Sequence, residues 1–330
     1  MELEKHVREA ADDFVAAGQP GVVVGAIAGD DTAIAGVGDD APDAHTLFEI
    51  GSVTKTFTSL ALFNRTRAGE VAYDQRLAEL LPAGRRVPER DGRAITLVDL
   101  ATHTSGLPRL PKGAMPRVLF DKRDPYARFT ADKVLAGLAR TRLRSVPGTT
   151  VTYSNLGVGL LGLALARQAG TDYATLIARE ITEPLGMTDT VVTVDPTRAA
   201  RLARGHTKSG KPAAPWTFDA LAGAGALRST AADMIVFLRA HLGTGIGAEA
   251  LRAGDASRRP TPDGTWMQPG WVGAGKEVPF YLHDGGTGGF SSFIGLFPGR
   301  RAGVVVLANS AADVSEAGLR FLGTVARLTA

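Results

Sequence analysis

Three short motifs in this chain carry side chains that together could transfer an acyl group. Residues 52–55 read S-V-T-K, residues 153–155 read Y-S-N, and residues 283–287 read H-D-G-G-T. They supply a hydroxyl nucleophile, an amine and a phenol that can move protons, and a glycine-rich segment able to donate backbone N–H groups to an oxyanion. With twelve serines and eight lysines in 330 residues, chance alone produces an S-x-x-K in roughly a third of such chains. Only the three motifs together therefore indicate a reaction site.

Ser52 and Lys55 are expected to lie on one face of a helix. Gly51 breaks the chain before Ser52, and apolar residues at helical spacing follow it. Residues three apart are neighbours on a helix, which would bring the amine near the hydroxyl. Lysine can deprotonate serine only where burial or nearby cations lower its pKa, and the helix N-terminus would favour an oxyanion beside Ser52. Read alone, such a motif would more often be an ordinary helix start with a solvated lysine.

The Y-x-N motif is rarer by chance, at roughly one chain in twenty of this composition. It precedes a predicted helix, so Tyr153 and Asn155 should lie at a loop edge. The phenol could exchange protons with Ser52 or with a leaving group if a nearby ammonium lowers its pKa. Asn155 could orient a substrate carbonyl or hold Lys55. The simpler alternative is a half-buried aromatic ring followed by a helix cap.

The third motif is a strand-like segment with glycines at 285, 286, 288 and 289. Glycine lets another backbone approach closely, and such a strand can lend a backbone N–H to an oxyanion hole. Outside this context, a glycine cluster of this kind would more often form a tight hairpin.

The elements that must position these motifs are most regular at the two ends of the chain. Helical spacing predicts a first helix, and β-branched runs then predict two strands joined by a Gly-Asp-Asp turn. Near the C-terminus three strands should form an antiparallel meander before a last helix. The expected strands are 22–28, 32–37, 278–283, 291–297 and 303–307, and the expected helices are 3–15, 53–68, 97–102, 156–168, 173–181, 231–242 and 314–328.

Two β-rich ends around a helix-rich middle predict an α/β protein of the α+β type. One antiparallel sheet would be built from both chain termini and flanked by helices. We assign residues 1–62 and 268–330 to this sheet domain and residues 63–267 to an inserted, mostly helical domain. The active site is then expected in the cleft between the two.

Composition excludes several classes of function. The chain has no cysteine, which removes a thiol nucleophile and thiolate metal sites, and its six histidines lack metal-ligand spacing. We therefore expect no metal and no other cofactor. The net charge of +3 is spread too thinly to bind nucleic acid, and no segment is apolar enough to span a membrane. Residues 1–6 lead into an acidic amphipathic pattern instead of a secretory signal, so we expect a cytoplasmic protein.

Two other enzyme motifs can be set aside. Residues 157–162 match the glycine spacing of a dinucleotide-binding turn, but no predicted strand precedes them, so we interpret the glycines as helix packing. No serine lies in a G-x-S-x-G elbow, which excludes the α/β-hydrolase arrangement.

With these motifs in this order, the chain resembles the serine β-lactamase and penicillin-binding-protein family. It is most similar to the class C-like branch, which also contains esterases, D-stereospecific peptidases and amidases, and acyltransferases. Segments 48–51, 102–108, 183–187 and 225–230 look like the connecting segments of that family, so the resemblance covers nearly the whole chain.

The resemblance implies a β-lactamase/transpeptidase-like fold and a role for each motif residue. Ser52 would be the acylated nucleophile, and Lys55 and Tyr153 would share the general-base and general-acid work. Asn155 would position the substrate, and the backbone N–H groups of Ser52 and Gly286 would form the oxyanion hole. Which of Lys55 and Tyr153 accepts the serine proton stays open.

The chain departs from a class C β-lactamase where such enzymes usually carry Lys-Thr-Gly. Here His283, Asp284 and Gly285 occupy that position, and we expect the first two to contact substrate. A substrate carboxylate about 5 Å from Asp284 would be repelled by roughly 3 kcal/mol at an effective dielectric of 20. The expected substrate is therefore a small neutral or cationic ester or amide. The acyl group would pass to water or to an amine, as in an esterase, amidase or transacylase.

Two alternatives remain from the sequence. If Asp284 faces away from the cleft and pairs with an arginine, a β-lactamase or a D-alanyl-D-alanine-type peptidase is open. The other alternative is a ligand-binding member of the fold that does not catalyse. The sequence makes no prediction of the oligomeric state.

Overall fold

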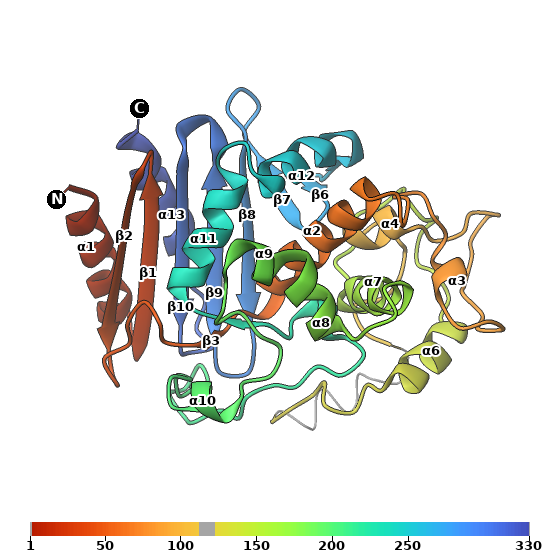
Figure 1. Cartoon of the computed structure of the whole chain (residues 1–330), viewed down its shortest axis with the longest axis horizontal. Coiled ribbons are helices and arrows are strands. Elements are labelled where there is room, and N and C mark those ends of the chain that lie inside the picture. Colours follow the sequence, from red (N-terminus) through yellow and green to blue (C-terminus); the bar gives the residue numbers. More distant parts are fainter. Residues whose placement is uncertain (1, 112–122, 330) are drawn as a thin grey trace.

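The computed structural model describes residues 2–111 and 123–329 (Figure 1). In this part of the chain, eight antiparallel strands form one sheet in the order β2-β1-β10-β9-β8-β7-β6-β5. A separate two-stranded ladder joins β3 (Phe48–Glu49) to β4 (Arg228–Ser229). The strands of the large sheet are β1 (Gly21–Ala28), β2 (Asp31–Gly38), β5 (Arg259–Pro260), β6 (Trp266–Gln268), β7 (Trp271–Ala274), β8 (Phe280–Gly286), β9 (Ser291–Phe297) and β10 (Ala302–Ala308).

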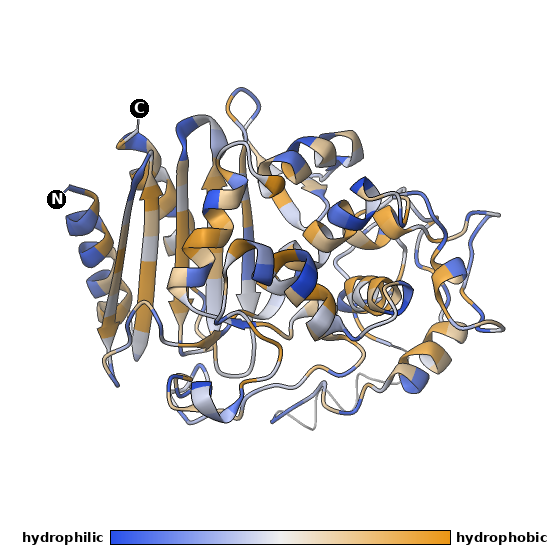
Figure 2. Cartoon of the chain, viewed as in Figure 1, coloured by the Kyte–Doolittle hydropathy of each residue, from blue (hydrophilic) through white to orange (hydrophobic). Residues whose placement is uncertain are grey.

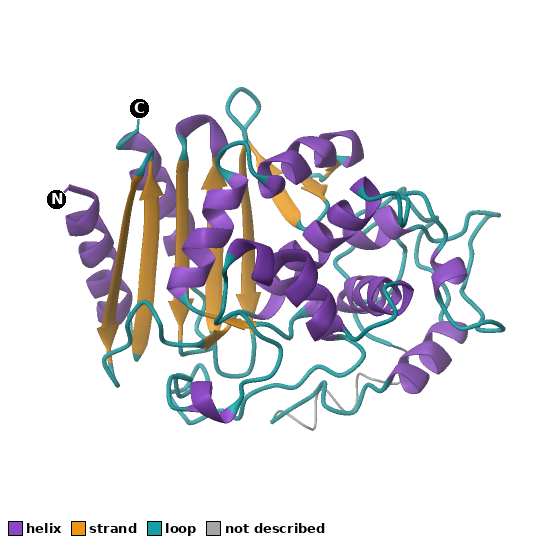
Figure 3. Ribbon diagram, viewed as in Figure 1, coloured by secondary structure: helices purple, strands orange, loops and turns teal. Residues whose placement is uncertain are grey.

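Helices cover both faces of the sheet (Figures 1 and 3). The first helix and the last helix pack on one face, and α11 packs on the other face against β1 and β10. The helices are α1 (Glu2–Ala16), α2 (Thr54–Arg67), α3 (Leu77–Leu80), α4 (Leu97–Ala101), α6 (Ala131–Ala139), α7 (Asn155–Gln168), α8 (Tyr173–Ile177), α9 (Glu183–Leu185), α10 (Pro196–Ala199), α11 (Ala231–His241), α12 (Ile246–Gly254) and α13 (Ser315–Arg327). Short 3₁₀ turns include η1 (Gly51–Val53) and η3 (Ala222–Ala224), and a π-helical turn, η2 (Ala178–Thr182), follows α8.

The central strands are apolar on both sides because both sides are covered (Figure 2). Successive side chains of a strand point to opposite faces. On β1, Val22 and Val24 join the apolar cluster under α1 and α13, whereas Val23 and Ile27 join the larger cluster that continues into the helical part. The N-terminal hairpin is thereby fixed to strands from the other end of the chain, with Val24 opposite Val306.

The helical part is built around α2 and α7, which are buried along most of their length. The glycines of α7 permit close packing against η3. A Cβ on Gly159 would lie 2.5 Å from Leu221 Cδ2, and one on Gly162 would lie 2.9 Å from the Gly223 Cα. These contacts confirm that the glycine pattern at 157–162 serves helix packing.

The structure confirms the expected fold class, a sheet built from both termini and flanked by helices. Most of the expected elements lie within one residue of the observed bounds, and two differ by more. The helix expected over 173–181 ends as an α-helix at Ile177 and continues as the π-helical turn, and the strand expected over 278–283 runs from Phe280 to Gly286. The strand therefore includes residues 283–286 of the third motif instead of ending at His283, and Thr287 follows it.

The division into domains stays a prediction. Strands β5 and β6 begin before residue 268 and yet belong to the large sheet. Among the described residues, no single helix is long and apolar enough to cross a membrane. Helices α11 and α12 pass that test only as a pair bent by 59°.

Candidate active site

Ser52 lies in the η1 turn that leads into α2, half-buried against strand β8. Gly51 before it adopts φ +47°, and a Cβ there would approach the Gly286 nitrogen to 2.7 Å. A side chain at this position would be both strained and obstructed. Glycine at 51 therefore allows the backbone that leads into Ser52 to touch β8.

Lys55 lies one helical turn after Ser52 and is hydrogen-bonded to it. Its Nζ donates to Ser52 Oγ at 2.9 Å and to the Ala224 carbonyl at 2.6 Å, and the side chain is 1% exposed. Burial lowers the pKa of Lys55 well below its ordinary value of 10.5. The charge of Arg109 lowers this pKa further, and the charge of Asp284 opposes the shift. The neutral amine, which can accept a proton, is correspondingly more populated.

Tyr153 approaches Ser52 from the other side. Its hydroxyl donates to Ser52 Oγ at 2.7 Å, and Lys55 Nζ lies 4.9 Å from its ring centroid. Burial raises the pKa of Tyr153, while the hydrogen bond to Ser52 acts in the opposite direction. A lowered pKa, the condition under which this phenol could serve as a base, is therefore not met.

Two buried histidines surround the reacting groups. Burial lowers the pKa of His103 well below 6.5 and that of His283 to about 4, so both are neutral near pH 7. His103 Nδ1 accepts from the Ser154 N–H at 3.2 Å, and its ring lies 4.5 Å from that of Tyr153. His103 thus orders the loop that carries Tyr153. His283 Nδ1–H donates to the Asp284 carbonyl at 2.7 Å.

Asn155 is buried beside this centre and does not hold Lys55. Its Nδ2 donates to the Tyr126 hydroxyl at 3.0 Å, and its Oδ1 has no hydrogen-bond partner among the described residues. Tyr126 belongs to an aromatic group, stacked on Phe218 at 4.6 Å and 5.4 Å from Trp216. The contact with Tyr126 was not predicted from sequence, because no motif or periodicity marks that tyrosine.

Strand β8 presents a free edge next to Ser52. Strand β7 pairs with β8 only over residues 280–282, so no strand within the described residues pairs with the segment from His283 to Gly286 on that side. A Cβ on Gly285 would lie 2.1 Å from the Ile50 carbonyl oxygen and 3.0 Å from the Ser52 nitrogen. The two backbones are therefore in direct contact, as an oxyanion hole formed by the N–H groups of Ser52 and Gly286 requires.

Charged side chains of opposite sign flank Tyr153. Arg109 Cζ lies 5.3 Å from the ring centroid, and Asp284 is close enough for its charge to raise the pKa values of Lys55, Tyr153 and His283. Asp284 is exposed and makes no ion pair with any described arginine. Arg109 is a second neighbour that sequence reasoning missed, since it lies in a loop with no motif of its own.

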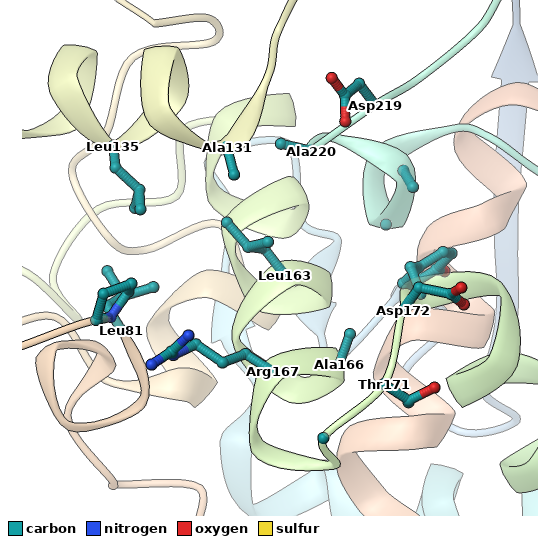
Figure 4. Close-up of a pocket in the computed structure, with 15 residues that line it drawn as sticks. Leu81, Ala131, Leu135, Leu163, Ala166, Arg167, Thr171, Asp172, Asp219 and Ala220 are labelled. Carbon is teal, nitrogen blue, oxygen red and sulfur yellow. The ribbon is translucent and has the colours of Figure 1, made fainter.

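A separate cavity of about 500 Å³ lies on the helical side and holds none of these groups (Figure 4). Its walls include Leu135 of α6, Leu163 and Arg167 of α7, and Asp172 and Asp219. Within the described ranges no three histidine, aspartate or glutamate side chains gather as metal ligands.

Comparison with known proteins relates the whole chain to a single family. The Beta-lactamase family model matches residues 4–325. The D-alanyl-D-alanine-carboxypeptidase/endopeptidase AmpH of Escherichia coli (strain K12) is 32% identical over 287 residues, which cover 81% of this chain and 71% of that protein. Penicillin-binding protein 4 of Amycolatopsis lactamdurans is 28% identical over 291 residues, covering 82% and 74%.

Solved structures agree with this relationship. The crystal structure of a beta-lactamase/D-alanine carboxypeptidase from Yersinia pestis superposes with a TM-score of 0.86 at 25% identity and covers 99% of each chain. The chain therefore matches one family over nearly its full length, in sequence and in fold. The chain belongs to the beta-lactamase family and is a serine hydrolase of that family.

Proposed function

We propose that this protein hydrolyses a small amide, peptide or ester through an acyl-enzyme on Ser52. The observation that carries the proposal is the environment of one atom. Ser52 Oγ lies 2.9 Å from the buried amine of Lys55 and 2.7 Å from the hydroxyl of Tyr153. Since the pKa of Lys55 is lowered and that of Tyr153 is raised, Lys55 is the proton acceptor and Tyr153 the proton donor.

Acylation follows from this division of roles. The neutral Lys55 amine takes the Ser52 proton as Oγ forms a bond to the substrate carbonyl carbon. The carbonyl oxygen becomes an oxyanion held by the N–H groups of Ser52 and Gly286, each worth on the order of 3–4 kcal/mol in the transition state. The bond to the leaving group then breaks as Tyr153 protonates it, and the phenolate recovers a proton from the Lys55 ammonium. Water completes the cycle by the reverse sequence of proton transfers.

The substrate class rests on the groups around Ser52. His283 is neutral where a class C enzyme carries lysine, and Asp284 acts electrostatically on the reacting residues, so the part of the substrate facing Asp284 should be neutral or cationic. The family relationship favours small amides or peptides. Asn155 Oδ1, buried and unpartnered among the described residues, is available to accept a hydrogen bond from a substrate N–H. An amine in place of water as acyl acceptor is the second candidate, because an acyl-enzyme can react with either.

The test uses an uncharged ester and a carboxylate-bearing cephalosporin. Purified enzyme, Ser52→Ala and the control Ser209→Ala, which changes an exposed loop serine, are mixed with p-nitrophenyl acetate and with a chromogenic cephalosporin. We expect ester turnover and a one-acetyl mass increase in wild type and control, and neither in Ser52→Ala. Added hydroxylamine traps the acyl group if amines compete with water.

Each other outcome contradicts a defined step. Ester turnover that survives Ser52→Ala refutes the nucleophile. Rapid cephalosporin hydrolysis refutes the expected exclusion of substrates whose only charge is a carboxylate and restores the β-lactamase alternative. The absence of both turnover and adduct with either compound supports the non-catalytic binder.

A further inference from the structure

Arg109 places an unpaired positive charge beside Tyr153. Its carbonyl accepts from the Leu156 N–H at 3.0 Å, which fixes the loop of Arg109 to the first turn of α7. The guanidinium carbon lies 5.3 Å from the Tyr153 ring centroid. The side chain is exposed and forms no ion pair with a residue that the structure describes. Its five N–H donors are therefore free to bind a ligand.

Asp284 places a negative charge on strand β8, the strand whose Gly286 backbone lies against Gly51 beside Ser52. It lies in the uncovered part of β8, is exposed, and has no ion-pair partner within residues 2–111 and 123–329. Its charge and that of Arg109 act on the same two groups, Lys55 and Tyr153, with opposite sign. The two side chains do not form an ion pair with each other, since none within 4.0 Å is present between them. Each thus keeps its binding capacity.

The position of both charges identifies the part of the substrate that they face. In the mechanism proposed above, Tyr153 protonates the leaving group, so the leaving atom must lie next to its hydroxyl. Substituents on the leaving group then extend past the Tyr153 ring toward Arg109, and along the part of β8 that carries Asp284. The repulsion of a carboxylate by Asp284 is offset wherever that carboxylate reaches Arg109.

We propose that Arg109 and Asp284 form a dipolar subsite for the leaving group, with Arg109 binding a carboxylate and Asp284 binding an ammonium. The preferred leaving group is then an amino acid with a free carboxylate and a basic side chain. This inference rests on the proposed acyl-enzyme function and names its substrate class. Arginine suits this role because its planar guanidinium binds a carboxylate through two parallel hydrogen bonds.

Four peptides of nearly constant size vary the side-chain ammonium and the C-terminal carboxylate of the leaving group independently. They are N-acetyl-alanyl-lysine, N-acetyl-alanyl-norleucine and the C-terminal carboxamide of each, prepared with L and with D residues. Hydrolysis is followed by mass spectrometry of the released amine, for wild type, Arg109→Gln, Asp284→Asn and the double variant. Arg167→Gln is the matched control, because Arg167 is also exposed without an ion pair to a described residue but lines the separate cavity.

We expect wild type to prefer the lysine acid at least tenfold in kcat/KM over the other three peptides. In Arg109→Gln the ratio of carboxylate to carboxamide kcat/KM should fall at least tenfold, mainly through KM. In Asp284→Asn the ratio of lysine to norleucine should fall by a similar factor. The control should keep both ratios.

The pH profile gives an independent readout. The charged or titratable groups around Lys55 are Arg109, Asp284, His103, His283 and Tyr153. Because Arg109 lowers the pKa of Lys55 and Asp284 raises it, the acidic limb of kcat/KM should move to higher pH in Arg109→Gln and to lower pH in Asp284→Asn.

The inference is overturned if Arg109→Gln loses equal activity toward carboxylate and carboxamide, since Arg109 then acts only through its neighbours. It is also overturned if wild type shows no preference among the four peptides while p-nitrophenyl acetate still acylates Ser52. Failure of acylation itself refutes the proposed function instead, so the two failures are distinguishable. Urea unfolding midpoints of all variants verify that a lost ratio does not reflect a lost fold.

Discussion

Replacing Arg228 with methionine is predicted to destabilise the backbone that carries Ser52. Arg228 and Glu49 form an ion pair at 2.9 Å with side chains 8% and 2% exposed, and this pair joins β4 to β3, shortly before Ser52. The guanidinium also donates to the carbonyls of Val192 at 2.7 Å and Ala226 at 3.0 Å. Methionine replaces most of the aliphatic volume but leaves these carbonyls without the guanidinium donor. It also leaves the buried Glu49 carboxylate without its positive partner, although the Trp216 N–H still donates to Glu49 at 2.8 Å. Breaking a buried pair in this way costs about 3–5 kcal/mol.

The loss should depend on pH with a defined sign. Burial raises the pKa of Glu49 above its ordinary value of 4.5, and the charge of Arg228 holds it down. Without Arg228 this pKa rises further. A carboxyl with a raised pKa binds more protons in the folded state, so its ionisation lowers the free energy of unfolding as pH rises. The difference between Arg228→Met and wild type should be largest at pH 7.5 and shrink toward pH 5.

Urea unfolding followed by circular dichroism at pH 7.5, 6 and 5 measures this effect. The control is Arg320→Met, which breaks an ion pair with Glu316 between side chains 66% and 88% exposed and should cost less than about 1 kcal/mol. Adding Glu49→Gln to Arg228→Met removes the buried charge and should recover part of the loss. The reasoning is refuted if Arg228→Met costs no more than the control, or if its cost is the same at every pH.

Three further substitutions test packing near the site. Gly285→Ala would place a Cβ 2.1 Å from the Ile50 carbonyl oxygen, so the rate of acylation by p-nitrophenyl acetate should fall on the order of 100-fold; an unchanged rate would contradict this contact. Tyr173→Phe removes a 2.7 Å hydrogen bond to the buried Thr58 hydroxyl and should lower the free energy of unfolding by about 1 kcal/mol in urea, whereas a more stable variant would exclude that bond. Phe57→Ala empties a fully buried position and should cost about 3–5 kcal/mol, and a loss below about 1 kcal/mol would show that the site collapses without a cavity.

Local patterns accounted for much of the fold. The run from Ser291 to Phe297 was predicted to the residue, because a proline-containing turn ends it and its neighbours are strongly apolar. The contact of Ser52 with Lys55 was likewise predictable, because residues three apart in a helix are neighbours on its surface. Interactions of this kind depend only on nearby residues, so sequence spacing contains them.

Contacts between distant segments were not available from spacing. Tyr153 meets Ser52 across a sequence separation of 101 residues, and only the family resemblance placed them together. Tyr126 and Arg109 were missed because a single aromatic or basic residue in a loop has no periodicity to mark it. The directions of the pKa shifts at Lys55 and Tyr153 also depend on burial by the complete fold, which no local pattern reports.

Because β1 pairs with β10, the sheet that supports the active site can close only after almost the whole chain has been synthesised. Residues 21–28 leave the ribosome early and can form a hairpin with β2, but their other edge is covered only when residues 302–308 emerge. Until then a valine-rich edge stays open to pairing with other chains, which is an aggregation hazard during folding. Ser52 likewise acquires the Gly286 backbone only late. A nascent chain is therefore inert toward substrates until its sheet is nearly closed, and its need for protection is greatest just before that point.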